Sequence, residues 1–196
     1  MRKIVVTEFV SLDGVIEEPG WTFQFDRGPE GNTFKNDELF ASDALLLGRV
    51  TYQGFAQAWP TMKEYGDFGD RMNNIPKYVV SATLTDAEAV WGDTTVIRGD
   101  VAAEVAKLKA QPGGDLLVEG SCQLVHTLVQ HGLVDEYRLM VFPIILGRGK
   151  RLFPDEMNEA AKLTLTESKT AGQGVLLLRY QYAPAAAPAG QPGAAA

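Results

Sequence analysis

The segment ALLLGRVTYQGFAQAWP, residues 44–60, places glycine, arginine and threonine where a buried strand is expected to end and a helix to begin. Gly48 permits a close approach of the backbone, and the free N–H groups of the following helix can hold an anion. Arg49 supplies a charged fork suited to phosphate, and Thr51 adds a hydroxyl donor. The same residues could also form only a helix cap beside a solvated arginine, so this segment alone leaves a phosphate site and a simple cap open.

Two further strand ends carry small or polar residues, in YVVSATL (78–84) and LLVEGSCQLVHTL (116–128). Each has a plain structural alternative, a turn serine in the first and tight strand–helix packing in the second. Three such junctions together favour one ligand site, because the carboxyl ends of parallel strands share a crevice. A G-x-G-x-x-G fingerprint is absent, so a standard Rossmann site is not predicted. The residues concerned are Ser81, Thr83, Glu119, Gly120 and Ser121.

The elements that position these junctions alternate between strand and helix for two-thirds of the chain and end in strands. Alternating units predict a mainly parallel sheet with helices on both faces, and the last strands would add antiparallel edges. Residues 17–33 are rich in glycine, proline and aromatic residues and predict a long loop. Strands are expected at 3–10, 43–48, 77–81, 94–99, 115–120, 135–147, 162–172 and 174–182, and helices at 32–42, 51–58, 100–114 and 121–132.

Composition narrows the class of protein. The 196 residues are 45% hydrophobic, which predicts one domain with a substantial core. The net charge of −7 without a basic block argues against a nucleic-acid partner. A single cysteine, Cys122, fits a reducing compartment. Glu8 and Asp13 interrupt the apolar N-terminus, and no stretch approaches the length of a membrane span, so we expect no membrane association and a cytoplasmic protein.

Metal and hydrolytic chemistry are not predicted. His126 lies among apolar residues of an expected helix, and His131 precedes a glycine at that helix's end. With Cys122 they form no zinc spacing, so no metal is expected. The serines lack the G-x-S-x-G pattern of a nucleophile elbow.

The ordered motifs SLDG, LLGRVTYQGF, YVVS and LLVEGSCQLVHTLVQHGLVDEYRLMVFPIILGRGKRLF resemble the dihydrofolate reductase superfamily. The similarity is strongest to the branch that contains the reductase domain of bacterial riboflavin-synthesis deaminase-reductases and its small stand-alone relatives, and it runs from Lys3 to Tyr182. It implies an NADPH-binding α/β three-layer sandwich with a mostly parallel eight-stranded sheet. The domain would span residues 1–183, and the Pro/Ala/Gly-rich residues 184–196 would form a disordered tail.

The resemblance also implies roles for the strand-end residues. The glycine-arginine-x-threonine motif would hold the pyrophosphate, with its arginine reaching the 2′-phosphate of NADPH. Ser81 and Thr83 would contact the adenosine end, and Arg98 would be a second cation for the 2′-phosphate. Glu119, Gly120 and Ser121 would lie beneath the pyrophosphate and nicotinamide. This chain has Ser121 where a second glycine is common. The implied cofactor-binding residues are Gly48, Arg49, Thr51, Ser81, Thr83, Arg98, Glu119, Gly120 and Ser121.

The substrate-binding residues are expected in the loop that follows the first strand. By the same resemblance, Leu12, Asp13 and Gly14 flank the nicotinamide and the substrate. Trp21, with two nearby phenylalanines, could close over the nicotinamide or pack as a flap on the core. Asp13 would be the nearest acid to the reacting ring, although a turn in LDG explains it as well.

A catalytic carboxylate is not identified. Folate reductases carry one on the first helix, and the matching position here falls near Asn32 in GPEGNTFKNDEL. Glu30, Asp37 and Glu38 could replace it or could be solvated charges, and among them Glu30 is kept with Asp13 as a candidate.

The sequence thus predicts an NADPH-dependent reductase of a small heterocyclic or sugar-linked substrate, similar to the riboflavin-pathway reductase domain. Weak dihydrofolate reduction is one alternative. A nucleotide-binding relative that has lost catalysis is another, and it would bind NADPH without consuming it. A homodimer is expected because relatives in this branch often pair, with the β-rich C-terminal part as the interface.

Overall fold

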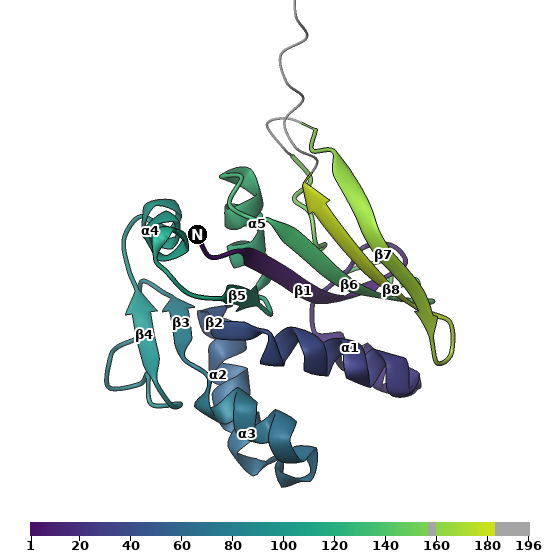
Figure 1. The fold of residues 1–196 in the computed structure, drawn as a ribbon, viewed down its shortest axis with the longest axis horizontal. Helices are drawn as coiled ribbons and strands as arrows, with labels where there is room; N and C mark the ends of the chain where they lie inside the picture. The colour runs from purple at the N-terminus through teal and green to yellow at the C-terminus, as the bar shows by residue number, and fades with distance from the viewer. Residues whose placement is uncertain (157–159, 183–196) are drawn as a thin grey trace, which may run out of the picture.

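The computed structural model describes residues 1–156 and 160–182, which form one eight-stranded sheet in the order β4-β3-β2-β5-β1-β6-β8-β7 (Figure 1). The first six strands run parallel to one another, and the last two pair antiparallel, which confirms the predicted architecture. The expected tail at 184–196 lies outside the described residues. The strands are β1 (Ile4–Ser11), β2 (Ser42–Gly48), β3 (Lys77–Val80), β4 (Thr94–Ile97), β5 (Asp115–Val118), β6 (Glu136–Phe142), β7 (Leu163–Ala171) and β8 (Val175–Tyr182).

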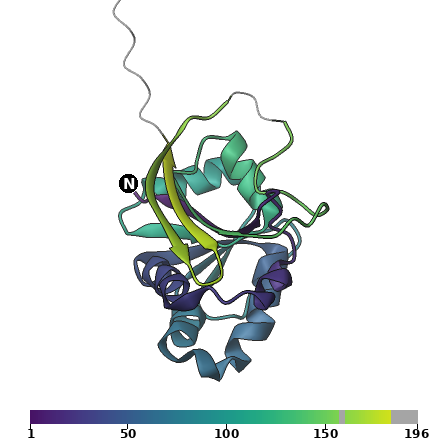
Figure 2. The same cartoon turned by 90° about the vertical axis from the view of Figure 1, so that its right-hand side faces the viewer.

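Helices cover both faces of the sheet, so the domain has three layers (Figure 2). The helices of the two faces pack on separate core clusters, three helices on one cluster and two on the other, as right-handed crossovers between parallel strands require. The helices of the first face are α1 (Gly28–Phe40), α2 (Arg49–Ala58) and α3 (Gly66–Asn74), and those of the second are α4 (Val101–Ala110) and α5 (Cys122–Gln130). Short 3-10 turns occupy η1 (Pro19–Gln24), η2 (Trp59–Thr61) and η3 (Lys63–Tyr65).

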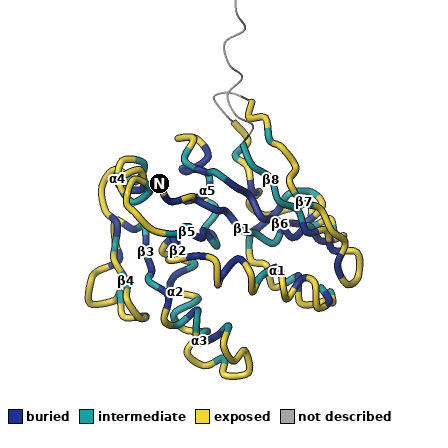
Figure 3. The backbone as a smooth tube through the Cα atoms, in the orientation of Figure 1, coloured by how far each residue is buried: buried dark blue, intermediate teal, exposed yellow. Residues whose placement is uncertain are grey.

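The central strands are buried on both faces because helices lie above and below them (Figure 3). Leu45, Leu46 and Leu47 of β2 are each fully buried, as expected of a strand inside a covered parallel sheet. The side chains of β1 alternate between the two helical layers. Val6 packs in the core beneath α5, and Val5 packs in the core on the α2–α3 side.

The structure differs from the predicted elements in several places, including the following. Helix α1 begins at Gly28, four residues before the expected start, with Pro29 at its first turn. Helix α3 and the two 3-10 turns before it occupy a stretch that was expected to be a loop. Strand β6 ends at Phe142 and not at Gly147, because the chain turns away from the sheet at Pro143.

Across the described part of the chain, no helix combines the length and the apolar character that crossing a membrane requires.

Candidate functional site

The β2–α2 and β5–α5 junctions meet at the carboxyl edge of the sheet. Gly48 N–H donates to the carbonyl of Gly120 (3.2 Å), which joins the two turns directly. A Cβ atom on Gly48 would overlap Ser121 Oγ and lie 3.0 Å from Ser121 Cβ. Only glycine therefore lets β2 approach the second junction this closely.

Gly120 has a φ of +88°, which L side chains rarely adopt, and a cis peptide joins it to Ser121. A Cβ atom on Gly120 would lie 3.0 Å from Thr51 Oγ1 and 3.8 Å from Glu8 Oε1. The bare backbone of Gly120 thus faces both a hydroxyl from the first turn of α2 and a carboxyl from β1. The structure brings together Gly48, Thr51, Gly120 and Ser121 as the sequence predicted.

The N-terminus of α2 fits an anion. Gly48 is its N-cap and offers no side-chain acceptor, so no side chain caps the first N–H groups of α2. Arg49 is exposed beside them, and its guanidinium donates to Gln53 Oε1 (3.0 Å). A phosphate can thus meet backbone N–H groups, the hydroxyl of Thr51 and the guanidinium of Arg49.

The residues predicted for the adenosine end are occupied with shaping the loop after β3. Ser81 Oγ accepts from the N–H groups of Thr83 (3.1 Å) and Leu84 (2.9 Å), which is the turn role that a strand-end serine commonly has. Arg98 donates to the carbonyl of Leu84 (2.8 Å) and pairs with Asp86 (2.9 Å). The side chain of Thr83 is exposed, so within this loop Thr83 is open to contact a ligand.

Asp13 anchors a loop. Its carboxylate accepts from Ser11 Oγ (2.7 Å) and from the N–H groups of Leu146 (3.1 Å) and Gly147 (2.8 Å). These hydrogen bonds, that of Ser11 first, lower the pKa of Asp13 to about 2. Asp13 thus has the turn-forming role in LDG that the sequence offered as the alternative, and its place as a catalytic candidate stays a prediction.

The aromatic loop after β1 packs mostly on the core. Trp21 and Phe25 contact the ring of Phe142 with centroids 5.6 and 5.7 Å apart. Phe23, by contrast, is 89% exposed. In this conformation Trp21 therefore packs as a flap on the core and does not stand open as a cover for the nicotinamide. Leu12, on the preceding turn, is exposed, and Gly14 closes that turn with a φ of +86°.

Sequence reasoning missed a buried charge cluster, the Lys35 cluster, formed by Lys35 with Thr7, Glu8, Glu38 and Glu119. Lys35 Nζ donates to Glu119 Oε1 (2.9 Å) and forms an ion pair with Glu38. Thr7 Oγ1 donates to Glu38 Oε1 (2.8 Å). These side chains come from β1, α1 and the end of β5, so the cluster lies directly beside the Gly120 junction.

Burial dominates the protonation of the Lys35 cluster. It raises the pKa of Glu8 to about 8, with the ammonium of Lys35 only partly opposing the shift. It also raises the pKa of Glu38, despite the same ammonium. Burial alone would lower the pKa of Lys35, but the carboxylates of Glu119 and Glu38 outweigh it and raise that pKa. Lys35 is charged at neutral pH, and Glu8 is largely protonated.

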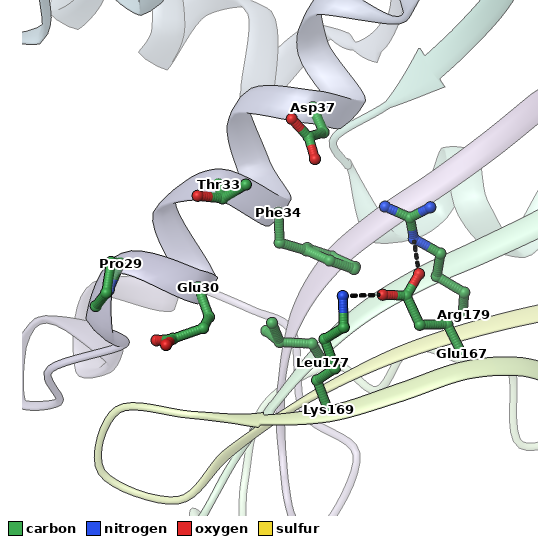
Figure 4. A pocket seen from close by; sticks show the side chains of 9 residues that line it. All are labelled: Pro29, Glu30, Thr33, Phe34, Asp37, Glu167, Lys169, Leu177 and Arg179. Atoms are coloured by element: carbon green, nitrogen blue, oxygen red, sulfur yellow. Dashed lines mark ion pairs between the residues drawn. The ribbon is translucent and has the colours of Figure 1, made fainter.

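The remaining candidate, Glu30, lies elsewhere. It lines a groove of about 300 Å³ between α1 and the β7–β8 hairpin, together with Asp37 (Figure 4). Glu167 pairs with Lys169 (2.7 Å) and Arg179 (3.2 Å) on the other side of this groove. None of the junction residues lines it. Glu30 and Asp37 are exposed and Glu38 is buried, so of the three acids considered on this helix only Glu38 reaches the site.

No group of three or more His, Cys, Asp or Glu residues suited to a metal ion occurs among residues 1–156 and 160–182. His126 instead lies 2.9 Å from the carbonyl of Arg151 and 3.4 Å from Cys122 Sγ.

Comparisons with known proteins find relatives that match almost the whole length of this chain. Two uncharacterized proteins of Bacillus subtilis, YyaP and YwjB, are 29% and 31% identical to the chain. Their alignments cover 92% and 90% of this chain and 95% and 96% of theirs.

Solved structures with the same fold include a protein of Shewanella sp. PV-4 ascribed to riboflavin biosynthesis, with a TM-score of 0.75 at 21% identity, covering 93% of this chain and 99% of that one. The riboflavin biosynthesis reductase Rib7 of Saccharomyces has a TM-score of 0.57 at 16% identity, covering 93% and 90%. A Thermotoga maritima deaminase/5-amino-6-(5-phosphoribosylamino)uracil reductase has a TM-score of 0.65 at 14% identity over 93% of this chain and 57% of its own.

The family profile named RibD C-terminal domain matches residues 2–177. With its dihydrofolate reductase-like fold, the chain belongs to the RibD C-terminal domain family.

Proposed function

We propose that this protein is an NADPH-dependent reductase of a small heterocyclic or sugar-linked compound. The observation that carries the proposal is the meeting of two side-chain-free positions, Gly48 and Gly120, beside the uncapped N-terminus of α2. A dinucleotide needs such a bare backbone with anion-holding N–H groups at the carboxyl edge of a parallel sheet. Membership of a family associated with reductases supports the same function.

The residues fit NADPH in named roles. Thr51 and the first N–H groups of α2 would hold the pyrophosphate, and Arg49 would hold the 2′-phosphate. Thr83 would contact the adenosine end. NADPH, once bound, supplies hydride. The chain's own contribution is to hold the cofactor at Gly120 and to surround the reacting atoms with the Lys35 cluster.

The substrate class follows from the cluster and from the relatives. Glu38 is the buried carboxyl on α1, and Lys35 and Thr7 already engage its Oε1, so it does not offer both carboxylate oxygens to a pterin as a folate reductase requires. The Thermotoga relative is named for a phosphoribosylaminouracil, a heterocycle linked to a sugar. We therefore favour a substrate of that chemical class over dihydrofolate. An inactive NADPH-binding protein would bind the cofactor but oxidise it with no compound in an NADPH-absorbance screen.

Replacing Arg49 by alanine is expected to weaken NADPH binding about 10- to 150-fold, since a charge-assisted phosphate contact contributes about 1.5–3 kcal/mol. NADH lacks the 2′-phosphate, so its affinity should change much less. The measurement is a fluorescence titration of each dinucleotide. Gln53→Ala removes the hydrogen-bond partner of Arg49 but not its charge, and Lys107→Ala removes a cation on α4; both should bind NADPH like the parent. Failure of the parent to bind either dinucleotide would refute the proposal.

We also propose a homodimer that uses the face of β7 and β8 opposite α1. Leu165 is 49% exposed and Leu176 is 42% exposed. Leu165 pairs with Tyr180 across the hairpin. Tyr180 is four residues after Leu176 in β8, and because side chains of a strand return to the same face every second residue, all three side chains share one face. This apolar face at the end of the sheet suits a second copy of the chain.

Leu165→Glu is expected to convert a dimer into a monomer, because a charge would be buried at the centre of the contact. Light scattering after size exclusion measures the mass against the 21.3 kDa of one chain. Val90→Glu, at an exposed position in the β3–β4 loop, is the matched control and should leave the mass unchanged. A monomeric parent at about 100 μM would argue against the dimer.

A further inference from the structure

Glu8 lies where β5 ends. Val6 of β1 pairs with Val118, the last residue of β5, so Glu8 is two residues beyond that pair and level with Gly120. On its other side Glu8 is level with Leu139 of β6, which is buried. A carboxyl group is thus placed where β1 runs past the end of β5, and the missing side chain of Gly120 leaves it facing the proposed cofactor site.

One oxygen of this carboxyl, Oε1, is buried and has no hydrogen-bond partner among residues 1–156 and 160–182. A buried ionised oxygen without a donor is costly, whereas a protonated carboxyl in the same place is tolerated. The orphaned oxygen therefore needs either a proton or a ligand beside it.

The groups around Glu8 explain why this carboxyl holds a proton at neutral pH, as burial also favours for Glu38, whose Oε2 has no partner among the described residues. Helix α1 contributes Lys35 and Glu38, the end of β5 contributes Glu119, and α5 contributes the thiol of Cys122. Three carboxyl groups therefore share one ammonium. Lys35 pairs with Glu38 and Glu119, and Thr7 donates a further hydrogen bond to Glu38. Glu8 has neither partner.

We propose that Glu8 is the acid that supplies the proton of the reduction, an inference that rests on the proposed NADPH-dependent function. Reducing a C=N or C=O bond needs a hydride at carbon and a proton at nitrogen or oxygen. NADPH is the two-electron reductant that supplies the hydride. Glu8 supplies the proton: its O–H bond breaks as the new N–H or O–H bond forms, and the resulting carboxylate is stabilised by Lys35 until water returns a proton.

The first test measures proton uptake and needs no substrate. NADPH is anionic, so its binding beside Glu8 should raise the pKa of this carboxyl further. At pH 8, where Glu8 is about half protonated, an upward shift of about one unit takes up about 0.4 proton per NADPH. Calorimetric titrations in buffers of different ionisation enthalpy measure this number. Glu8→Gln should abolish the uptake, and Glu104→Gln, on the distant helix α4, should retain it.

The second test measures turnover of the compound that the NADPH-absorbance screen identifies. Glu8→Gln keeps the shape of the side chain but carries no acidic proton, so kcat should fall about 10²- to 10⁴-fold. The affinity for NADPH should stay within about threefold of the parent. The parent's rate should decline as pH rises above about 8, where Glu8 loses its proton, and the residual rate of the variant should lack this decline.

The outcomes separate the two claims. If NADPH does not bind, or no compound is reduced, the proposed function fails and the inference falls with it. If NADPH binds and is consumed but Glu8→Gln takes up the same protons, or turns over at the parent's rate, the role of Glu8 alone is refuted.

Discussion

Gly48→Ala is expected to weaken NADPH binding by at least about tenfold and to lower the free energy of unfolding by about 1–3 kcal/mol. The backbone of Gly48 is ordinary for any residue, with a φ of −77°, so the effect is steric. The added methyl group would overlap Ser121 Oγ and force the β2–α2 and β5–α5 junctions apart. Urea unfolding and a fluorescence titration with NADPH measure the two effects.

A second substitution tests this cause. Ser121→Gly removes both side-chain atoms that the new methyl group would meet, so the double variant Gly48→Ala/Ser121→Gly should regain most of the lost stability and affinity. Ser121→Gly alone should change little, because Ser121 makes no side-chain cap to α5. If the double variant is no better than Gly48→Ala, the two junctions do not depend on the contact described.

Lys35→Met is expected to have the largest effect on stability, a loss of about 3–5 kcal/mol in the free energy of unfolding at pH 8. Lys35 is the cation that partners Glu38 and Glu119, and its side chain is only 12% exposed. Without it, the carboxylates of the Lys35 cluster are buried with no counter-charge. Lys169→Met, which removes an exposed lysine paired with Glu167 on β7, should cost less than about 1 kcal/mol.

The loss should depend on pH in a defined direction. Burial already raises the pKa values of Glu8 and Glu38 above their usual 4.5, and removing Lys35 raises them further. Above pH 4.5 the folded state then binds more protons than the unfolded state, so stability falls as pH rises. Lys35→Met should thus be less damaging at pH 5 than at pH 8. Adding Glu38→Gln should restore part of the stability at pH 8; an equal loss at both pH values would contradict the argument.

The sheet was predictable because its central strands are buried on both sides and read as continuous apolar runs, such as the leucines of β2. The start of α1 was missed because Gly28 and Pro29 resemble a loop, although proline is favourable in the first turn of a helix. Helix α3 was missed because it contains two glycines, Gly66 and Gly69, and is mostly polar. Its burial depends on packing against α1 and the preceding 3-10 turns, which no local pattern reveals.

The junction residues of the site were predictable for a similar reason, since each follows its own strand directly in the sequence. The Lys35 cluster was not, because Thr7, Lys35 and Glu119 lie far apart in the chain. They meet only because β5 lies next to β1 and the side chain of Lys35 reaches from α1 to both Thr7 and Glu119. A local signal did exist in Glu8, a charged residue inside a β-branched apolar strand, which sequence reasoning used only to dismiss an N-terminal targeting segment.

The position of β1 has a consequence for how the chain acquires its fold during synthesis. Ile4 pairs with Leu116, and Val5 pairs with Glu136, so β1 is synthesised more than 100 residues before the strands that it pairs with. Closing such long loops costs entropy before any pairing compensates for it, which slows folding. Until β5 emerges both edges of β1 are unpaired, and until β6 emerges one edge stays unpaired and could pair with other chains. A nascent chain halted before Phe142 is therefore the species most in need of a chaperone.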